Sequence, residues 1–203
     1  MNDSDRQQLR QQMRQARRGI TGTERDRAEQ AINQQLIGMT AFRDAGRIAL
    51  YSAFDGEPSM TASIDAALAS GKLVFLPVLP ASADAPLSFA PIEPASHTQT
   101  NRHGILEPAV GAESFIAADQ LDLVITPLVA FDPQGNRLGM GAGYYDRTFA
   151  FTVNQAPAST RLIGVAFQRQ KHSALDPQPW DVPLWRIVTE TRQYPSHKKA
   201  TEN

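Results

Sequence analysis

The residues best suited to chemistry lie in one glycine-rich stretch, FDPQGNRLGMGAGYYDR, at residues 131–147. Gly139, Gly141 and Gly143 follow one another at alternate positions. Glycine adopts positive φ without strain and carries no Cβ, so successive backbone N–H groups can turn inward and surround an anion. A helix that begins just after the glycines directs further N–H groups at the same anion. The stretch therefore predicts a phosphate-binding loop, with a tight surface turn before a helix cap as the alternative.

Charged residues on either side of the glycines set the chemistry of this loop. Arg137 precedes them, whereas Asp146 and Arg147 follow. A guanidinium group can bind two phosphate oxygens, and an aspartate beside a phosphate is suited to hold Mg²⁺. The spacing G-x-G-x-G is not the dinucleotide fingerprint, and the lysine and hydroxyl of a Walker loop are missing. Asp146 has a second interpretation, as an acid that favours the start of a helix.

The loop must be positioned by the elements around it, and the nearest is a buried strand of apolar and β-branched residues at 123–127. We predict further strands at 47–52, 72–77, 87–92, 161–167 and 181–189. Helices are predicted at 4–19, where Ser4 and Gln7 form a capping box, at 23–40, where Thr23 is the cap, at 60–70 and at 144–152. Strands that alternate with helices indicate a three-layer α/β domain with a largely parallel sheet.

Composition limits the classes of protein that remain. The chain has 203 residues, a formal charge of -1 and no cysteine, so we expect one domain over residues 1–194 and a disordered tail over 195–203. Disulfides and a thiolate nucleophile are excluded. No global positive field attracts nucleic acid or an anionic membrane, and there is neither a signal peptide nor an apolar run of about 20 residues. We expect a soluble cytoplasmic protein.

Two further groups of residues lie outside the loop. The predicted first helix carries Arg6, Arg10 and Arg14 along one stripe, followed by Arg17 and Arg18; charge pattern alone indicates a solvated face. Glu57 follows the strand at 47–52. It is either an acid at the start of the next helix or a ligand-binding residue, because α/β sheets bind ligands at the carboxyl ends of their strands.

The whole loop resembles the signature of the 5-formyltetrahydrofolate cyclo-ligase (5,10-methenyltetrahydrofolate synthetase) family, Phe-Asp-x-x-Gly-x-Arg-Leu-Gly-x-Gly-x-Gly-Tyr-Tyr-Asp, and every fixed position is present. The resemblance covers nearly the whole chain. It implies a Rossmann-like fold similar to sugar-phosphate isomerases and CoA transferases. It also implies conversion of 5-formyltetrahydrofolate to 5,10-methenyltetrahydrofolate with ATP and Mg²⁺, through phosphorylation of the formyl oxygen.

The resemblance assigns site residues as well. It implies catalytic roles for Arg10 and Arg137 and a Mg²⁺ site at Asp146 and Asp181. ATP would be bound by Arg6, where many relatives have lysine, Arg10, Arg137, Leu138, Gly139, Met140, Gly141, Ala142, Gly143, Tyr144 and Tyr145. The folate would be bound by Arg10, Glu57, His103, Glu107 and Tyr144. His103 and Glu107 are implied by the segment Gly104-Ile-Leu-Glu-Pro108, which resembles a family segment beside the substrate.

Three other functions remain open at this point: a non-catalytic folate- or nucleotide-binding module, a sugar-phosphate isomerase or CoA transferase that needs no ATP, and a related ligase for another formylated or carboxylated amine. ATP-dependent turnover of 5-formyltetrahydrofolate separates the cyclo-ligase from all three. The expected partner is a small molecule, a reduced folate that can be polyglutamylated, and the expected state is a monomer. Neither nucleic acid nor membrane is expected to bind.

Overall fold

The computed structural model describes residues 1–94, 96–154 and 160–195, and its centre is a seven-stranded sheet in the order β11-β10-β9-β6-β1-β2-β3. The strands are β1 (Arg47–Ala49), β2 (Leu73–Val78), β3 (Ser88–Ile92), β6 (Leu123–Pro127), β9 (Arg161–Val165), β10 (Arg186–Val188) and β11 (Gln193–Pro195). Strands β2, β1, β6, β9 and β10 pair in parallel, whereas the edge strands β3 and β11 are antiparallel. The predicted α/β class with a largely parallel sheet is confirmed.

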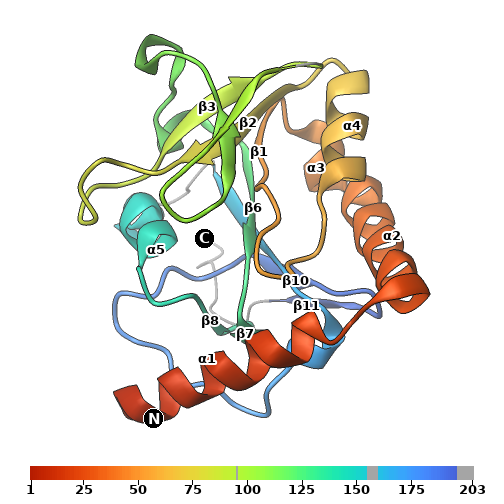
Figure 1. Cartoon of the computed structure of the whole chain (residues 1–203), viewed down its shortest axis with the longest axis vertical. Coiled ribbons are helices and arrows are strands. Elements are labelled where there is room, and N and C mark those ends of the chain that lie inside the picture. The colour runs from red at the N-terminus through yellow and green to blue at the C-terminus, as the bar shows by residue number, and fades with distance from the viewer. Residues whose placement is uncertain (95, 155–159, 196–203) are drawn as a thin grey trace, which may run out of the picture.

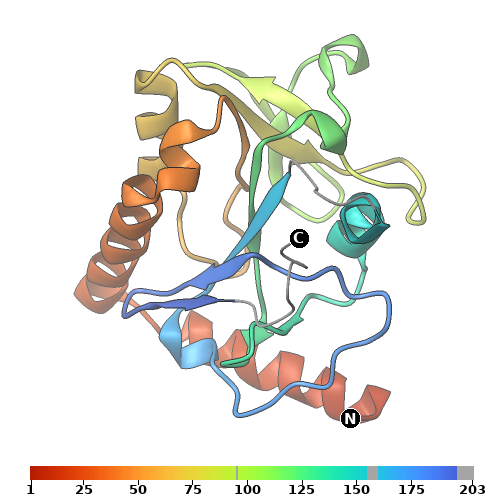
Figure 2. The same ribbon diagram turned by 180° about the vertical axis from the view of Figure 1, so that it is seen from behind.

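Helices cover both faces of the sheet (Figures 1 and 2). They are α1 (Asp3–Arg18), α2 (Gly22–Gly38), α3 (Thr40–Asp44), α4 (Thr61–Ala69), α5 (Tyr144–Phe149) and α6 (Phe151–Asn154), with short 3-10 helices η1 (Ala112–Ser114), η2 (Ala118–Gln120) and η3 (Gln168–Gln170). Successive residues of β6 point to opposite faces, so Ile125 packs with Leu36 of α2 while Val124 packs with Phe149 of α5. Helix α1 lies beyond the carboxyl end of β6, beside β7 and β8 (Figure 1).

Two small hairpins that the sequence did not predict flank the sheet. One pairs β4 (Thr98–Thr100) with β5 (Leu106–Pro108), and the other pairs β7 (Ala130–Phe131) with β8 (Arg137–Leu138). The second lies inside the glycine-rich stretch itself, so a strand pair separates the buried strand β6 from the glycines. The strands of both hairpins have only two or three residues, which is too short to show an alternating hydrophobic pattern in the sequence.

The helix caps differ from the prediction. Asn2 rather than Ser4 caps α1, because its side chain accepts from the Asp5 N–H at 2.9 Å while the Asp5 carboxylate accepts from the Asn2 N–H at 3.1 Å. The N-cap of α2 is Thr21 rather than Thr23, and its side chain makes no capping hydrogen bond. Both helices therefore begin one residue earlier than expected.

The carboxyl-terminal strand is also shorter than predicted. The expected strand at 181–189 forms only as β10, and residues 181–185 run in irregular structure beside the glycine-rich stretch. Pro195, placed in the predicted tail, belongs to β11, and residues 196–203 lie outside the described residues. Within the described part of the chain, no helix has the length and apolar character needed to cross a bilayer.

Candidate active site

The glycine-rich stretch is built on a rigid turn. The Asp132 carboxylate, which is buried, accepts from the backbone N–H groups of Gln134 and Asn136 and from the Leu175 N–H at 2.9 Å. These bonds close the turn between β7 and β8 and fasten it to the segment before Asp181. A buried carboxylate with this many donors is structural, since its acceptor positions are filled by the protein. Asp132 thus explains one fixed position of the signature without a role in binding.

The glycines adopt the backbone conformations expected of an anion-binding loop at two of three positions. Gly141 has φ +107° and Gly143 has φ +68°, whereas Gly139 has no positive φ. A Cβ at Gly141 would lie 3.5 Å from the Arg10 guanidinium carbon. Helix α5 begins at Tyr144 directly after Gly143. The sequence requires glycine here because the backbone is left-handed and a side chain of α1 approaches it.

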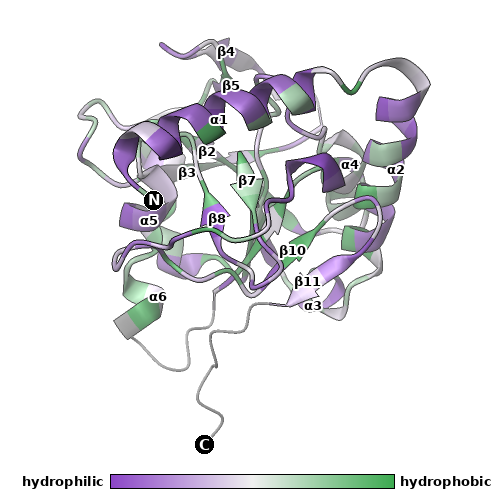
Figure 3. Ribbon diagram, turned by 90° about the horizontal axis from the view of Figure 1, so that it is seen from below, coloured by the Kyte–Doolittle hydropathy of each residue, from purple (hydrophilic) through white to green (hydrophobic). Residues whose placement is uncertain are grey.

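Helix α1 brings the predicted ATP-binding arginines to this loop. Its apolar residues Leu9 and Met13 pack against Leu138 of β8, which turns Arg10 toward the glycines, and Arg10 Nε donates to the Gly139 carbonyl at 2.9 Å. Hydrophilic residues cover most of the rest of the helix (Figure 3). Arg6 donates to the Asp176 carbonyl at 2.9 Å.

The pKa of Arg10 reflects its closeness to Arg6 and Asp181. Burial and then the neighbouring charge of Arg6 lower the pKa of Arg10, while Asp3 and Asp181 oppose this change. Two guanidinium groups therefore lie near each other beside the glycine loop, with the Asp181 carboxylate close enough to interact with Arg10. This positive region is local, since the whole chain carries a formal charge of -1.

Asp146 and Asp181, separated by 35 positions, are brought to the same place. Asp146 Oδ1 accepts from the N–H of Val182, the residue after Asp181, at 3.0 Å, and forms an ion pair with Arg137. Arg137 also donates to the Val182 carbonyl. Asp181 Oδ2 accepts from the Gln178 N–H at 2.8 Å. Among the described residues, no group of three or more potential ligand side chains surrounds this pair.

Glu57 is buried in the loop between β1 and α4, with 7% of its surface exposed. Its Oε2 accepts from the Phe54 N–H at 3.0 Å, and its Oε1 lies 3.7 Å from Arg17. Burial raises the pKa of Glu57 to about 7, against the opposing charge of Arg17. Its carboxylate also contributes to the raised pKa values of the buried Tyr51 and Tyr145 hydroxyls. The Glu57 carboxylate is therefore close enough to interact with Tyr145 of α5, the helix that follows the glycines.

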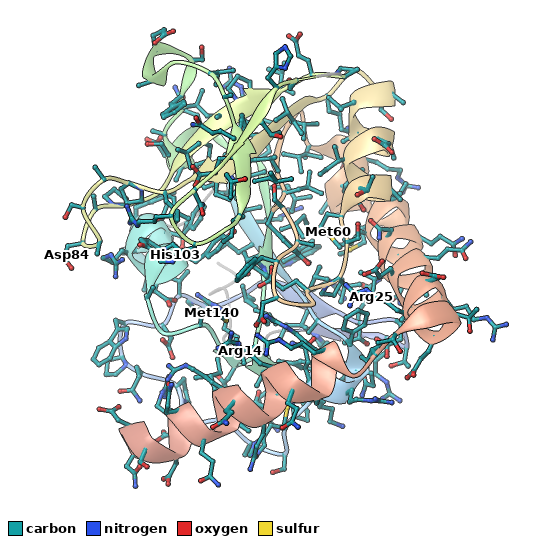
Figure 4. All side chains as sticks on the ribbon, viewed as in Figure 1. Arg14, Arg25, Met60, Asp84, His103 and Met140 are labelled. Atoms are coloured by element: carbon teal, nitrogen blue, oxygen red, sulfur yellow. The ribbon has the colours of Figure 1, made fainter. Side chains whose placement is uncertain are left out.

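The hairpin of β4 and β5 lies over the same region. Glu107 is buried, and its Oε1 accepts from the Leu79 N–H at 2.8 Å and from the Asn101 side chain at 2.7 Å, so it holds the hairpin to the end of β2. His103 is exposed in the hairpin turn, on the side of the molecule that carries α5 (Figure 4). A Cβ at Gly104 would lie 3.7 Å from the Phe54 ring.

Tyr144 connects this hairpin to the glycine loop. Its hydroxyl accepts from Arg102 at 3.1 Å, and the Arg147 guanidinium lies 5.2 Å from the centre of its ring. Tyr144, which was predicted to bind both ATP and folate, thus contacts the hairpin that carries His103 and Glu107.

The sequence missed Arg17 and Asp55. Arg17 was grouped with the solvated arginines of α1, but its side chain is fully buried, and Asp55 has φ +54°. Asp55 accepts from Arg14 at 2.6 Å and from Arg17 at 2.8 Å, and it also pairs with Arg18. The Asp55-Gly56 pair marks a turn in the sequence, and aspartate adopts positive φ more readily than most residues. Nothing in one sequence, however, indicates that three arginines of α1 converge on Asp55.

The site is thus a glycine-rich loop beside a largely parallel α/β sheet, with arginines and two aspartates around it. The chain belongs to the 5-formyltetrahydrofolate cyclo-ligase family, whose model matches residues 2–190. It is 39% identical over 188 residues to the Haemophilus influenzae protein named 5-formyltetrahydrofolate cyclo-ligase, covering 93% of this chain and 99% of that protein. Membership of this family makes the chain a ligase, as the signature predicted.

Two solved structures share the fold. The solution structure of Aquifex aeolicus 5,10-methenyltetrahydrofolate synthetase has a TM-score of 0.80 at 27% identity, covering 98% of this chain and 96% of that chain. A 5,10-methenyltetrahydrofolate synthetase from Mycoplasma pneumoniae has a TM-score of 0.71 at 26% identity, covering 92% of this chain and 99% of that chain. The architecture thus extends over nearly the whole chain, whereas the likeness to sugar-phosphate isomerases and CoA transferases stays a prediction.

Proposed function

We propose that the protein converts 5-formyltetrahydrofolate to 5,10-methenyltetrahydrofolate with ATP and Mg²⁺, releasing ADP and phosphate. The observation that supports this most is the position of α5. The glycine loop, Arg10, Arg137 and the two aspartates lie around its first turn, and the buried Glu57 carboxylate interacts with Tyr145 of the same helix. This arrangement supports a proposed anion site next to a proposed carboxylate site for a ring with N–H donors, as a reaction between ATP and a folate requires.

The proposed chemistry follows from the substrate. The formyl group on N5 is an amide, so its carbon resists attack by N10 and its oxygen is a poor leaving group. Transfer of the γ-phosphoryl group to this oxygen makes an iminium phosphate and ADP. N10 then attacks the formyl carbon and loses its proton, and the carbon–oxygen bond breaks to release phosphate. Such a transfer requires alignment and positive charge on the transferred group rather than covalent catalysis by the protein.

The residues present fit these needs. We assign the phosphates to the backbone of residues 138–145 together with Arg6, Arg10 and Arg137, with Arg10 and Arg137 placed to stabilise charge on the transferred group. Leu138 is buried and contributes backbone only. Arginine has five N–H donors, and Arg137 uses two groups on Asp146 and Val182. Its other donors make no hydrogen bond within the described chain.

Mg²⁺ fits Asp146 and Asp181. In each carboxylate, one oxygen accepts hydrogen bonds and the other accepts none within the described residues. Mg²⁺ binds few carboxylates, keeps several waters and bridges phosphate oxygens, so two aspartates are a sufficient protein contribution. When bound, the ion supplies positive charge across the phosphates.

We assign the pterin of the folate to Glu57, whose carboxylate can accept two N–H groups from one ring edge. We assign the rest of the substrate to Tyr144, Arg10 and His103. Glu107 is assigned an indirect contribution, since its Oε1 holds the hairpin turn that carries His103.

The proposed function is tested by incubating the purified protein with 5-formyltetrahydrofolate and following the absorbance of 5,10-methenyltetrahydrofolate. We expect product only when ATP and Mg²⁺ are both present, with one ADP released for each product. Equal product formation without ATP contradicts the proposal. Binding of folate and ATP without any turnover would indicate the non-catalytic module instead.

Folate affinity is expected to rise with pH. Burial raises the pKa of Glu57 to about 7, so the carboxylate that accepts the pterin N–H groups is protonated below this value and ionised above it. The KM for 5-formyltetrahydrofolate should therefore fall as the pH increases through about 7. Steady-state kinetics over this range check the prediction, because kcat/KM reports groups of the free enzyme.

Glu57→Gln serves as the control. Its folate KM should be high and independent of pH across the same range. The effect on stability has the opposite sign: because the folded-state pKa lies above the ordinary 4.5, Glu57 favours folding below about 4.5, and this contribution is lost as the pH rises through 7. The melting temperature of Glu57→Gln should therefore fall less between about pH 4.5 and 7 than that of the wild type. A folate KM that falls equally with pH in both proteins would exclude Glu57 as the titrating group.

A further inference from the structure

Arg17 is a charged side chain with no exposed surface. Its Nε donates to the Asp55 carbonyl at 2.9 Å, its Nη2 to Asp55 Oδ2 at 2.8 Å and its Nη1 to the Leu128 carbonyl at 3.2 Å. The same Nη1 lies 3.7 Å from Glu57 Oε1. A buried guanidinium is tolerated only when it is paired and hydrogen-bonded. Here each of its three nitrogens has a partner.

These partners belong to separate parts of the proposed site. Arg17 lies near the end of α1, the helix that brings Arg10 to the glycine loop. Asp55 lies in the loop that carries Glu57, and Leu128 follows β6 and leads toward the β7–β8 hairpin. The Arg17 side chain therefore connects three parts of the chain. Helix α1 and the end of β6 position the glycine loop, and the loop that contains Asp55 positions Glu57.

The cluster around Asp55 leaves positive charge near Glu57. Arg14, Arg17 and Arg18 all pair with the one Asp55 carboxylate, so their three positive charges exceed its single negative charge. Arg14 points from α1 toward the interior of the molecule (Figure 4). Arg17 is the member of this cluster whose guanidinium also reaches the Glu57 carboxylate. Glu57 is thus the second anion beside an incompletely neutralised group of arginines.

We propose that Arg17 is a positioning residue for the folate site: it fixes the loop through Asp55 and favours the ionised form of the buried Glu57 carboxylate, so that Glu57 can accept the N–H groups of a pterin. This inference rests on the proposed function, from which the assignment of the pterin to Glu57 comes. Arg17 itself has no exposed surface and acts through Glu57 rather than on the substrate.

The groups that face Glu57 come from every element around it. Burial and Asp55 disfavour the charged carboxylate, whereas Arg17, the Phe54 N–H and Arg14 favour it. Tyr51 and Tyr145 are also close enough to interact with Glu57. Burial is the largest influence and raises the pKa of Glu57 to about 7; Arg17 is the largest influence in the opposite direction. Without Arg17, Glu57 should be protonated at neutral pH.

Arg25 of α2 provides a matched control. It donates to the backbone carbonyls of Gly56 at 3.3 Å and Glu57 at 2.7 Å, and it pairs with Glu29 at 2.7 Å. Like Arg17, Arg25 fastens the loop that carries Glu57, and it points toward the interior (Figure 4). Its bonds are to the backbone of the loop and not to the Glu57 carboxylate. The pair of variants therefore separates loop anchoring from control of the charge on Glu57.

The experiment compares Arg17→Met and Arg25→Met in steady-state kinetics as a function of pH. For Arg17→Met we expect the acid limb of kcat/KM for folate to move up by about one pH unit, the size of effect a neighbouring opposite charge exerts. The folate KM at pH 7 should accordingly increase about fivefold, because the ionised fraction of Glu57 falls by that factor, while the ATP KM should change little. Arg25→Met should leave the acid limb in place. Equal limb shifts in the two variants, or none in Arg17→Met, would overturn the proposal.

A measurement that needs no turnover guards against a failure of the proposed function. Carbon-13 NMR titration of glutamate carboxyls, with Glu57→Gln to assign the resonance, should show Glu57 titrating at higher pH in Arg17→Met than in the wild type. If Arg17→Met does not fold, Arg17→Lys is used instead. Lysine retains the positive charge but not the forked geometry of arginine. In this variant Glu57 should titrate near its wild-type pH, while the folate KM should rise. An inactive wild type refutes the function, whereas an unmoved Glu57 titration in Arg17→Met, or a strongly moved one in Arg17→Lys, refutes the inference.

Discussion

Replacing Arg137 with alanine is expected to lower kcat by about 100-fold, because a donor aimed at charge that develops in the transition state is worth this much in other enzymes. The guanidinium is held between the Asp146 carboxylate and the Val182 carbonyl, and only 7% of its side chain is exposed. It is therefore anchored beside the glycine loop, with further N–H groups available to the phosphates. Steady-state kcat and the KM for ATP measure the effect.

Arg161→Ala is the matched control for this variant. Arg161 is an exposed arginine of β9 whose guanidinium lies 5.0 Å from the centre of the Trp185 ring. It belongs to none of the groups assigned to the site, so its loss should leave kcat unchanged. Arg137→Lys should recover only part of the activity, since lysine keeps the charge but cannot hold two acceptors in one plane. If Arg137→Ala retains normal kcat and ATP affinity, Arg137 is a structural part of the turn.

Several strands of the sheet could be predicted because they are short apolar runs between turn residues. β6 has the predicted bounds 123–127, and β3 differs from its prediction by one residue. β11 escaped prediction, since its sequence Gln193-Tyr-Pro195 has no apolar run. It forms because Ile187 of β10 offers an unpaired edge to Tyr194. Pairing with a neighbour that lies elsewhere in the chain is a tertiary effect that local pattern does not contain.

The candidate site likewise has a part that could be predicted from the sequence and a part that could not. The glycine loop and the residues around it could be identified because they stand together in one string, and Gly141 and Gly143 have the positive φ that the string indicated. Arg17 could not be separated from Arg14 and Arg18, because the three have the same side chain on the same helix. What distinguishes Arg17 is burial against Asp55, 38 positions away, and Leu128, 111 positions away.

Replacing Asp146 with asparagine is expected to raise the Mg²⁺ concentration needed for half-maximal activity by at least about tenfold, because a metal site that depends on few carboxylates loses one of its charges. Asparagine has nearly the same shape and keeps an oxygen that can accept from the Val182 N–H, which Asp146 Oδ1 now does at 3.0 Å. Binding of folate without metal should be largely retained. Mg²⁺ titration of turnover and calorimetry of folate binding measure the two quantities.

Asp146 also has a structural interpretation, because it stands in the first turn of α5 and pairs with Arg137. An acid at that position stabilises a helix by about 0.3–1 kcal/mol, so on this interpretation Asp146→Asn should lower the melting temperature and leave the Mg²⁺ requirement unchanged. Asp132→Asn is the control for a purely structural effect. The Asp132 carboxylate is buried and closes the turn between β7 and β8, so its replacement should reduce thermal stability without changing the Mg²⁺ concentration needed for half-maximal activity.

Asp181→Asn completes the comparison. Asp181 does not lie in the first turn of a helix, and its Oδ2 accepts from the Gln178 N–H at 2.8 Å. A change in the Mg²⁺ requirement of Asp181→Asn therefore cannot come from the loss of a helix-dipole interaction. If Asp146 and Asp181 hold one ion, each asparagine variant should raise the Mg²⁺ requirement, and the double variant should add little to the more severe single one. A double variant whose effect is the full sum of both, or an Asp146→Asn protein that differs from the wild type only in melting temperature, would rule out a shared Mg²⁺ site.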